Sequence, residues 1–428
     1  MNLADNDLAA VQRRTLRVLF ATQIISGVGV GIGASVGALL AADLAGVGLS
    51  GLAPSTGVIG AALLALPATA IVRRRGRRPS LSTAYLVAAL GAILIVTSAV
   101  QDAAPLLFAG YFLFGGATAA GLQARYAAVD LAPPKLRGRH LSAIVWATTI
   151  GAIAGPNLAS FAGATLSEYG VPTLAGPFVF SAILFVLAAL VLTLLMRPDP
   201  AILARETAPP STGTGVRPRQ TGMRAALRFV ASHPPARLGV TAMAVGHLVM
   251  VGVMVMTPLH IRSARHDAAH TLRIVGVVIS LHVAGMYAFS PVMGWLTDRI
   301  GRRPVILTGI ALLIAACALA ATAGHDQTRL ALGLFVLGLG WSCTMVAGST
   351  LLSESVPVEL RASAQGLSDL TMGLAGASAG ALSGVVVYAW GFPMLGLIAA
   401  LATVPFIALA TRREGGQRSK DRVATPGA

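Results

Sequence analysis

The sequence predicts an all-α membrane protein with twelve transmembrane helices in two pseudo-symmetric six-helix bundles. The 428 residues are 55% hydrophobic and only 11% charged, with a mean hydropathy of +0.76, whereas soluble chains carry about 25% charged residues. Apolar runs of about 20 residues, long enough to span a bilayer, recur about twelve times. Lipid offers the backbone no hydrogen bonds, and continuous apolar runs lack the alternation of a barrel, so these runs must be helices.

Each run ends at charged residues or prolines, which fix its limits to within a few positions. The first six runs cover residues 16–40, 52–72, 79–100, 105–129, 141–166 and 174–196. The last six cover residues 238–260, 273–296, 304–323, 329–352, 364–388 and 392–411. Cys317 and Cys343 fall inside predicted spans, where we expect them to serve in packing. The first run is long enough to be a span and shows no cleavage site, so we expect it to direct membrane insertion itself.

The net charge of +16 reports orientation in the membrane. Most of the 32 Lys and Arg residues lie in the N-terminal segment, alternate short loops, the central connection and the tail, while the other side has only Arg262, Arg265, Arg273 and Arg329. By the positive-inside rule, we expect both termini in the cytoplasm and the chain in the inner (cytoplasmic) membrane. Nucleic acid is excluded as a partner, because orientation accounts for the charge and no basic patch is interleaved with aromatic residues.

The two halves are related by a shift of about 225 residues. Gly76-Arg77-Arg78-Pro79 aligns with Gly301-Arg302-Arg303-Pro304, and, with a one-residue slip, "DLAPPKLR" (130–137) aligns with "ESVPVELR" (354–361). We therefore expect an N-terminal bundle over 1–196, a cytoplasmic linker over 197–237, a C-terminal bundle over 238–411 and a cytoplasmic tail over 412–428. Within the linker, "GMRAALRFVA" is either an amphipathic surface helix or a solvated turn. Two such bundles are typical of transporters that rock around a midplane site.

A basic turn occurs in both halves but keeps its acid only in the second. Residues 294–303, "GWLTDRIGRR", form a G-x-x-x-D-R-x-G-R-R pattern, whereas the first copy has Arg73 where the second has Asp298. An acid at a helix end can face the positive N-terminus of a neighbouring helix, and arginines can reach carboxylates on adjacent loops. In the alternative interpretation the arginines only anchor topology.

With twelve spans around it, this turn resembles the signature loop of the major facilitator superfamily, and the resemblance covers about Leu16 to Thr411. It implies a cytoplasmic latch that joins the halves in one state and breaks in the other, intact only in the second half. The predicted gate comprises Gly294, Asp298, Arg299, Gly301, Arg302 and Arg303 with Asp130, Arg137, Glu354 and Arg361.

A second motif, "GAIAGPNLAS" (151–160), lies in the fifth span. Gly151 and Gly155 share a helix face that admits a neighbouring backbone, and Pro156 bends the helix. This resembles the G-x-x-x-G-P motif of the drug:proton antiporter branch, although Ala159 replaces the final glycine and the fourth-helix Arg of that branch is absent. A plain small-residue packing seam is the alternative.

Ionisable residues inside spans are costly and therefore mark functional sites by default. The proton-coupling candidates are Asp369, His247 and His282, because histidine titrates near neutral pH and a carboxyl group can exchange a proton in an apolar cavity. Each could instead be a hydrogen-bonded packing residue. The substrate-cavity candidates are Gln23, Arg125, Asn157, Met250, Met254, Tyr287 and Trp341.

The outside loop holds His260, His266, His270 and Asp267 among arginines, which oppose a cation, so a solvated loop or a pH-sensitive outer gate is favoured over a metal site. We expect no metal, cofactor or enzymatic constellation, and no phosphate loop marks ATP as an energy source. We predict a monomeric, proton-coupled exporter of hydrophobic or amphipathic small molecules such as drugs or antibiotics. A metabolite or sugar uniporter or symporter, supported by "ESVPVELR", and a non-transporting membrane sensor are the alternatives.

Overall fold

The computed structural model describes residues 5–133, 137–207, 223–264 and 267–411, and every regular element in these ranges is a helix. The helices of the first half are α1 (Asp5–Ala45), the short 3-10 helix η1 (Val47–Leu49), α2 (Leu52–Arg75), α3 (Arg77–Gln101), α4 (Ala104–Ala127), α5 (Arg137–Ser167) and α6 (Gly176–Leu195). The connection contains α7 (Pro200–Glu206) and α8 (Met223–Ser232). The second half comprises α9 (Pro234–Arg262), α10 (Ala268–Tyr287), α11 (Ser290–Ile300), α12 (Arg302–Ala321), α13 (Gln327–Ser355), α14 (Val358–Leu401) and α15 (Val404–Thr411).

The all-α membrane fold is confirmed. Ten ranges in the described part of the chain are long and apolar enough to cross a membrane, and one of them, Ser363–Ile407, holds two spans. These two spans meet at Gly391, whose φ of 81° interrupts α14. Together with α5, which is bent by the internal Pro156, these ranges account for the twelve predicted helices.

The predicted eighth span is not one continuous helix. It divides into α10 and α11 at Ala288 and Phe289, just before Pro291. Proline removes a backbone donor and clashes with the preceding turn, which explains the break.

The described part of the predicted linker contains the short helix α7 and the amphipathic helix α8. The segment "MRAALRFVAS" is α8, which buries Ala226 and Val230 against α9 and α14 and leaves Leu227 54% exposed. The second linker helix, α7, was not predicted; Asp199 caps it by accepting from the backbone N–H groups of Ala201 and Ile202.

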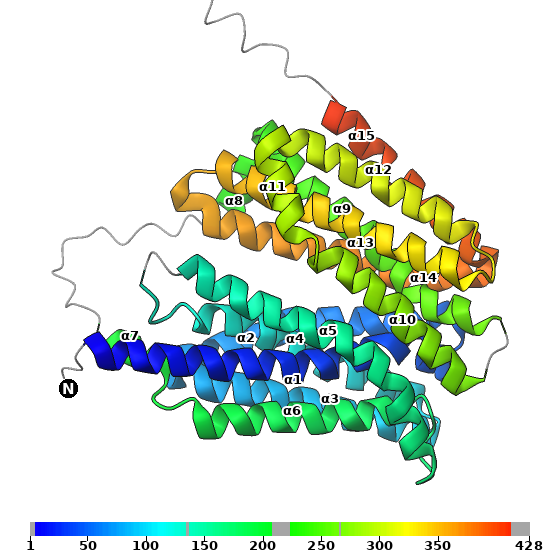
Figure 1. Cartoon of the computed structure of the whole chain (residues 1–428), viewed down its shortest axis with the longest axis horizontal. Helices are drawn as coiled ribbons and strands as arrows, with labels where there is room; N and C mark the ends of the chain where they lie inside the picture. Colours follow the sequence, from blue (N-terminus) through cyan, green and yellow to red (C-terminus); the bar gives the residue numbers. More distant parts are fainter. Residues whose placement is uncertain (1–4, 134–136, 208–222, 265–266, 412–428) are drawn as a thin grey trace, which may run out of the picture.

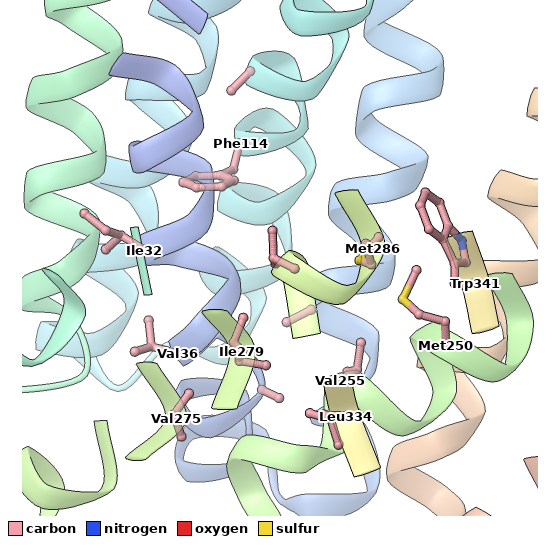
Figure 2. Packing of buried hydrophobic residues seen from close by; sticks show 14 of the residues in the cluster. Ile32, Val36, Phe114, Met250, Val255, Val275, Ile279, Met286, Leu334 and Trp341 are labelled. Atoms are coloured by element: carbon pink, nitrogen blue, oxygen red, sulfur yellow. The ribbon is translucent and has the colours of Figure 1, made fainter. Parts of the chain in front are cut away.

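Two groups of helices pack side by side (Figure 1). At one end, the linker side, lie α7, α8 and the turns at Gly76 and Gly301; we refer to the opposite end as the far side. The groups meet toward the far side through α5 with α10 and α2 with α14. One continuous cluster of buried apolar residues runs through both groups, and Figure 2 shows part of it, with Ile32 and Val36 from α1 and Val275 and Ile279 from α10.

Candidate functional site: an opening between the two halves

Hydrogen bonds between the halves lie toward the far side. The Ser55 hydroxyl on α2 donates to the Ala377 carbonyl on α14 at 2.9 Å, and Asn157 on α5 donates to the Ser280 hydroxyl on α10 at 2.6 Å. At the outer end of this seam, Arg262 and Asp43 form an ion pair of 2.5 Å. These contacts close the far side of the molecule.

Glycine and proline shape this seam. A Cβ on Gly155 would lie 2.8 Å from the Gly31 Cα on α1, and one on Gly276 of α10 would lie 2.8 Å from the Pro156 carbonyl. The predicted packing face of Gly151 and Gly155 therefore meets α1, where Gly27 and Gly31 admit it. Because Pro156 lies against Gly276 of the other half, the motif forms part of the far-side closure.

The same helix faces are exposed toward the linker side. Leu66 lies about three turns beyond Ser55 on α2, and Leu374 lies about one turn before Ala377 on α14. Their side chains are 68% and 58% exposed, and Trp146 on α5 is 60% exposed. Figure 1 shows the helices of the two halves diverging toward the linker side, and we refer to the region between them at this end as the opening.

Each half contributes a charge of opposite sign on this side of the molecule. Asp369 on α14 is exposed, and the charge of Arg125 in the last turn of α4 acts on both Asp369 and Tyr287. The charged nitrogen and oxygen atoms of Arg125 and Asp369 are more than 4.0 Å apart, so the two residues do not form an ion pair. Both residues were singled out from the sequence, and each comes from a different half.

The second half contributes an aromatic group at the same level. Trp341 Nε1 donates to His247 Nδ1 at 3.1 Å, so the neutral imidazole carries its proton on Nε2. Tyr287 packs edge-on against Trp341 with ring centroids 5.6 Å apart. Met250 lies beside this group, buried in the apolar cluster (Figure 2), and Met254 packs against the same cluster.

The first half contributes a polar network. Gln23, only 3% exposed, accepts from the Tyr85 hydroxyl at 3.0 Å and donates to Thr148 at 3.3 Å. Ser26 shares a hydrogen bond with the same hydroxyl at 3.0 Å. Tyr85, Ser26 and Thr148 were not predicted, because single polar groups in apolar runs carry no signal of their partners.

His282 lies apart from the opening. It is fully buried on α10, and its Nδ1 bonds the Leu334 carbonyl at 2.8 Å. Its Nε2 has no hydrogen-bond partner among the described residues. Asn157, also a cavity candidate, lies in the far-side seam. Of the three proton-coupling candidates, Asp369 is the one exposed at the opening.

Each half has its own charged cluster at the linker side. Arg77 forms two hydrogen bonds with Asp130, of 2.8 and 3.1 Å, and Arg302 forms two with Glu354, of 2.9 and 2.6 Å. Asp298, 78% exposed, lies 3.7 Å from Arg302. These pairs follow the sequence repeat, since Arg77 aligns with Arg302 and Asp130 with Glu354.

The remaining gate residues lie around the second turn. The Arg299 guanidinium stacks over the Trp295 ring at 5.2 Å, and Gly301 has a φ of 94°. A Cβ added to Gly294 would have no neighbour within 4 Å among the described residues, and Arg303 lies in the first turn of α12. Arg137 begins α5 and Arg361 lies in the first turn of α14, but their side chains are outside the described part of the structure, as is His266 in the outside loop.

Comparisons with known proteins match this architecture. The family model described as Major Facilitator Superfamily matches residues 19–272 and 265–426. The MFS-type transporter YdeG of Bacillus subtilis (strain 168) is 36% identical over 408 residues, covering 95% of this chain and 93% of YdeG. The riboflavin transporter RfnT of Brucella anthropi is 28% identical over 414 residues, covering 93% of this chain and 96% of RfnT.

A solved structure shares the fold. The bacterial homologue of the human lysosomal transporter Spinster, in an inward-facing and unoccupied conformation, superposes with a TM-score of 0.73 at 16% identity, covering 94% of this chain and 96% of that one. The model match spans nearly all of the sequence, and the predicted superfamily is confirmed. The chain therefore belongs to the major facilitator superfamily of membrane transporters.

Proposed function

We propose that this transporter exports hydrophobic or amphipathic small molecules in exchange for protons, by alternating access. The observation that carries the proposal is the pair of opposite charges at the opening, Arg125 on one half and the exposed Asp369 on the other. Charges that face each other across a moving interface couple protonation to movement, because neutralising one removes their attraction.

The direction of coupling follows from the sign of these charges. Ionised Asp369 attracts Arg125 and favours closure of the linker side, whereas protonated Asp369 favours the open form. A substrate that enters from the linker side would be carried outward while Asp369 is ionised. Proton uptake at the far side would then return the molecule to the linker-open form, so one proton moves inward as substrate moves outward.

Closure of the linker side requires the far-side seam to separate. The Arg262–Asp43 pair would break, as would the hydrogen bonds of Ser55 and Asn157. Because the Arg262–Asp43 pair is exposed, its loss contributes at most about 1 kcal/mol to the cost of opening the seam. The positive-inside rule assigns the linker side to the cytoplasm, so in this proposal the opening faces the cytoplasm.

The side chains of the second half near the opening would suit an aromatic or amphipathic substrate. Trp341 and Tyr287 offer ring faces and edges, Met254 is adaptable, and Arg125 and Asp369 offer both signs of charge. Transport of a planar metabolite is the second candidate function, because RfnT, similar over nearly its whole length, is a riboflavin transporter.

Transport in proteoliposomes with an imposed pH gradient tests the proposal, with ethidium and riboflavin as probes. We expect gradient-driven ethidium movement in the wild type and its loss in Asp369→Asn. The matched control is Asp102→Asn, since Asp102 lies on the first half after α3 and asparagine tolerates its left-handed φ of 53°. Ethidium movement that ignores the gradient would refute proton coupling. Riboflavin movement alone would favour the second candidate, and movement of neither probe would favour a non-transporting sensor.

A further inference from the structure

The first basic turn lacks the acid of its repeat, yet a carboxylate occupies the N-terminus of the helix that follows it. Asp199, which lies after α6, accepts from the backbone N–H of Arg77 at 3.1 Å and from that of Arg78 at 2.7 Å. Both N–H groups lie in the first turn of α3, where the backbone offers them no partner within the helix. The helix dipole also favours negative charge at this end. A Cβ on Gly76 would lie 2.4 Å from Asp199 Oδ2, so the carboxylate occupies the space that glycine leaves free.

The same linker helix also holds the other side of the turn. Arg205, near the end of α7, donates to the Val72 carbonyl at 2.9 Å, in the last turn of α2. A cation is favourable at the C-terminus of a helix for the same reason that an anion is favourable at the N-terminus. Through Asp199 and Arg205, α7 therefore complements both helix ends that meet at Gly76.

The segment so held faces the opening. Pro67 lies inside α2 and removes a backbone donor, which weakens the helix between its far-side contact at Ser55 and the turn at Gly76. Leu66, beside this proline, is 68% exposed. To close the linker side, the end of α2 beyond Pro67 must move with the rest of the first half.

We propose that Asp199 is a positioning residue for transport: through α7, it joins the α2–α3 turn to α6, so that the first half moves as one rigid body. It thereby provides, from the linker, the carboxylate that Arg73 cannot provide. The inference rests on the proposed alternating-access function, but not on the identity of the substrate or on proton coupling. It assigns to the first ten residues after Met196 the task of holding the first half together, rather than that of a passive connection.

The test compares Asp199→Ala with Asp326→Ala. Asp326 caps α13 by accepting from the backbone N–H groups of Thr328 and Arg329, at 2.9 and 3.1 Å, so it matches the chemistry of Asp199 at a helix end away from the linker side. Spin labels at Leu66→Cys and Leu374→Cys, in a background without Cys317 and Cys343, report the distance across the opening. Ethidium and riboflavin transport are measured in the same variants.

We expect Asp199→Ala to broaden the Leu66 to Leu374 distance distribution and to lower the maximum transport rate about tenfold with KM unchanged, the size expected for a lost charged cap. Arg205→Ala, which leaves Asp199 in place, is expected to broaden the same distribution. Asp326→Ala is expected to lower thermal stability without changing the distances. Equal effects of Asp199→Ala and Asp326→Ala, or an unchanged distribution in both α7 variants, would overturn the proposal.

The two proposals fail in different ways. Distance distributions need neither substrate nor a proton gradient, so a chain that transports neither probe still reports whether α7 holds α2. Broadening without transport would refute the exporter function and retain the role of Asp199 in joining α7 to the turn. Transport by an Asp199→Ala variant at the wild-type rate would refute the positioning role alone.

Discussion

The turns at Gly76 and Gly301 descend from one pattern and are held in different ways. In the first half, α2 continues through Pro67 to the turn, and α7 contacts both helix ends there. In the second half, the helix breaks just before Pro291, which aligns with Pro67 at the one-residue slip of the repeat, and the short α11 leads to the turn. The comparison indicates that one turn is fixed within its own half, while the other keeps an exposed acid, Asp298, for a contact elsewhere.

Substitution of the glycines should give the largest difference in stability between the two turns. Both have a φ of 94°, which strains any residue with a Cβ, but only Gly76 has a carboxylate where that Cβ would lie. We expect Gly301→Ala to cost about 1 to 2 kcal/mol of stability from strain. Gly76→Ala should cost about 3 kcal/mol, because it also displaces the cap. Thermal unfolding of the two variants in one detergent measures the difference, and equal losses would contradict the asymmetry.

The ion pairs of Arg77 and Arg302 should show a smaller difference in stability than the glycines. The Arg77 and Asp130 side chains are 13% and 17% exposed, whereas those of Arg302 and Glu354 are 28% and 50% exposed. Arg77 also donates to Gln123 at 3.0 Å. Removing one partner of a shielded pair leaves an unpaired charge, so we expect Arg77→Ala to cost about 2 kcal/mol. Arg302→Ala should cost clearly less, since water replaces its partner more readily.

Asp130→Asn and Glu354→Gln serve as the reciprocal variants for this test. They remove the charge from the acid and keep the size of each side chain. Thermal unfolding at low and at high salt separates the pairs, because salt screens exposed charges more than shielded ones. A larger salt effect on the Arg77 pair than on the Arg302 pair would contradict the interpretation.

Sequence patterns predict the features that recur along the chain, such as the apolar runs and the two basic turns. The structure adds contacts that have no counterpart in the repeat. Apolar run length predicts the helices, and the pairing of Arg302 with Glu354 follows because turn and acid recur at nearly one offset. Asp199 carries no such signal, since its partners at Arg77 and Arg78 are far away in the chain and are backbone groups. Tyr85 likewise resembles any aromatic residue in a span, although Gln23, its partner, stands out as a polar residue in an apolar run.

Asp298 provides the smallest but most specific test of the comparison. It lies at the end of α11, which continues α10, and α10 packs against α5. In the proposed closure of the linker side, Asp298 would approach the N-terminus of α5, which attracts an anion. The equivalent position on α2 is Arg73, which has no carboxylate. Asp298→Asn should leave thermal stability nearly unchanged. It should raise the ratio of open to closed molecules, read from the Leu66 to Leu374 distance distribution, about two- to fivefold. Glu168→Gln, at an exposed acid on the far side, should leave the distribution unchanged. A shift of equal size in both variants would mean that the distribution responds to net charge, and Asp298 would then have no specific contact in the closed form.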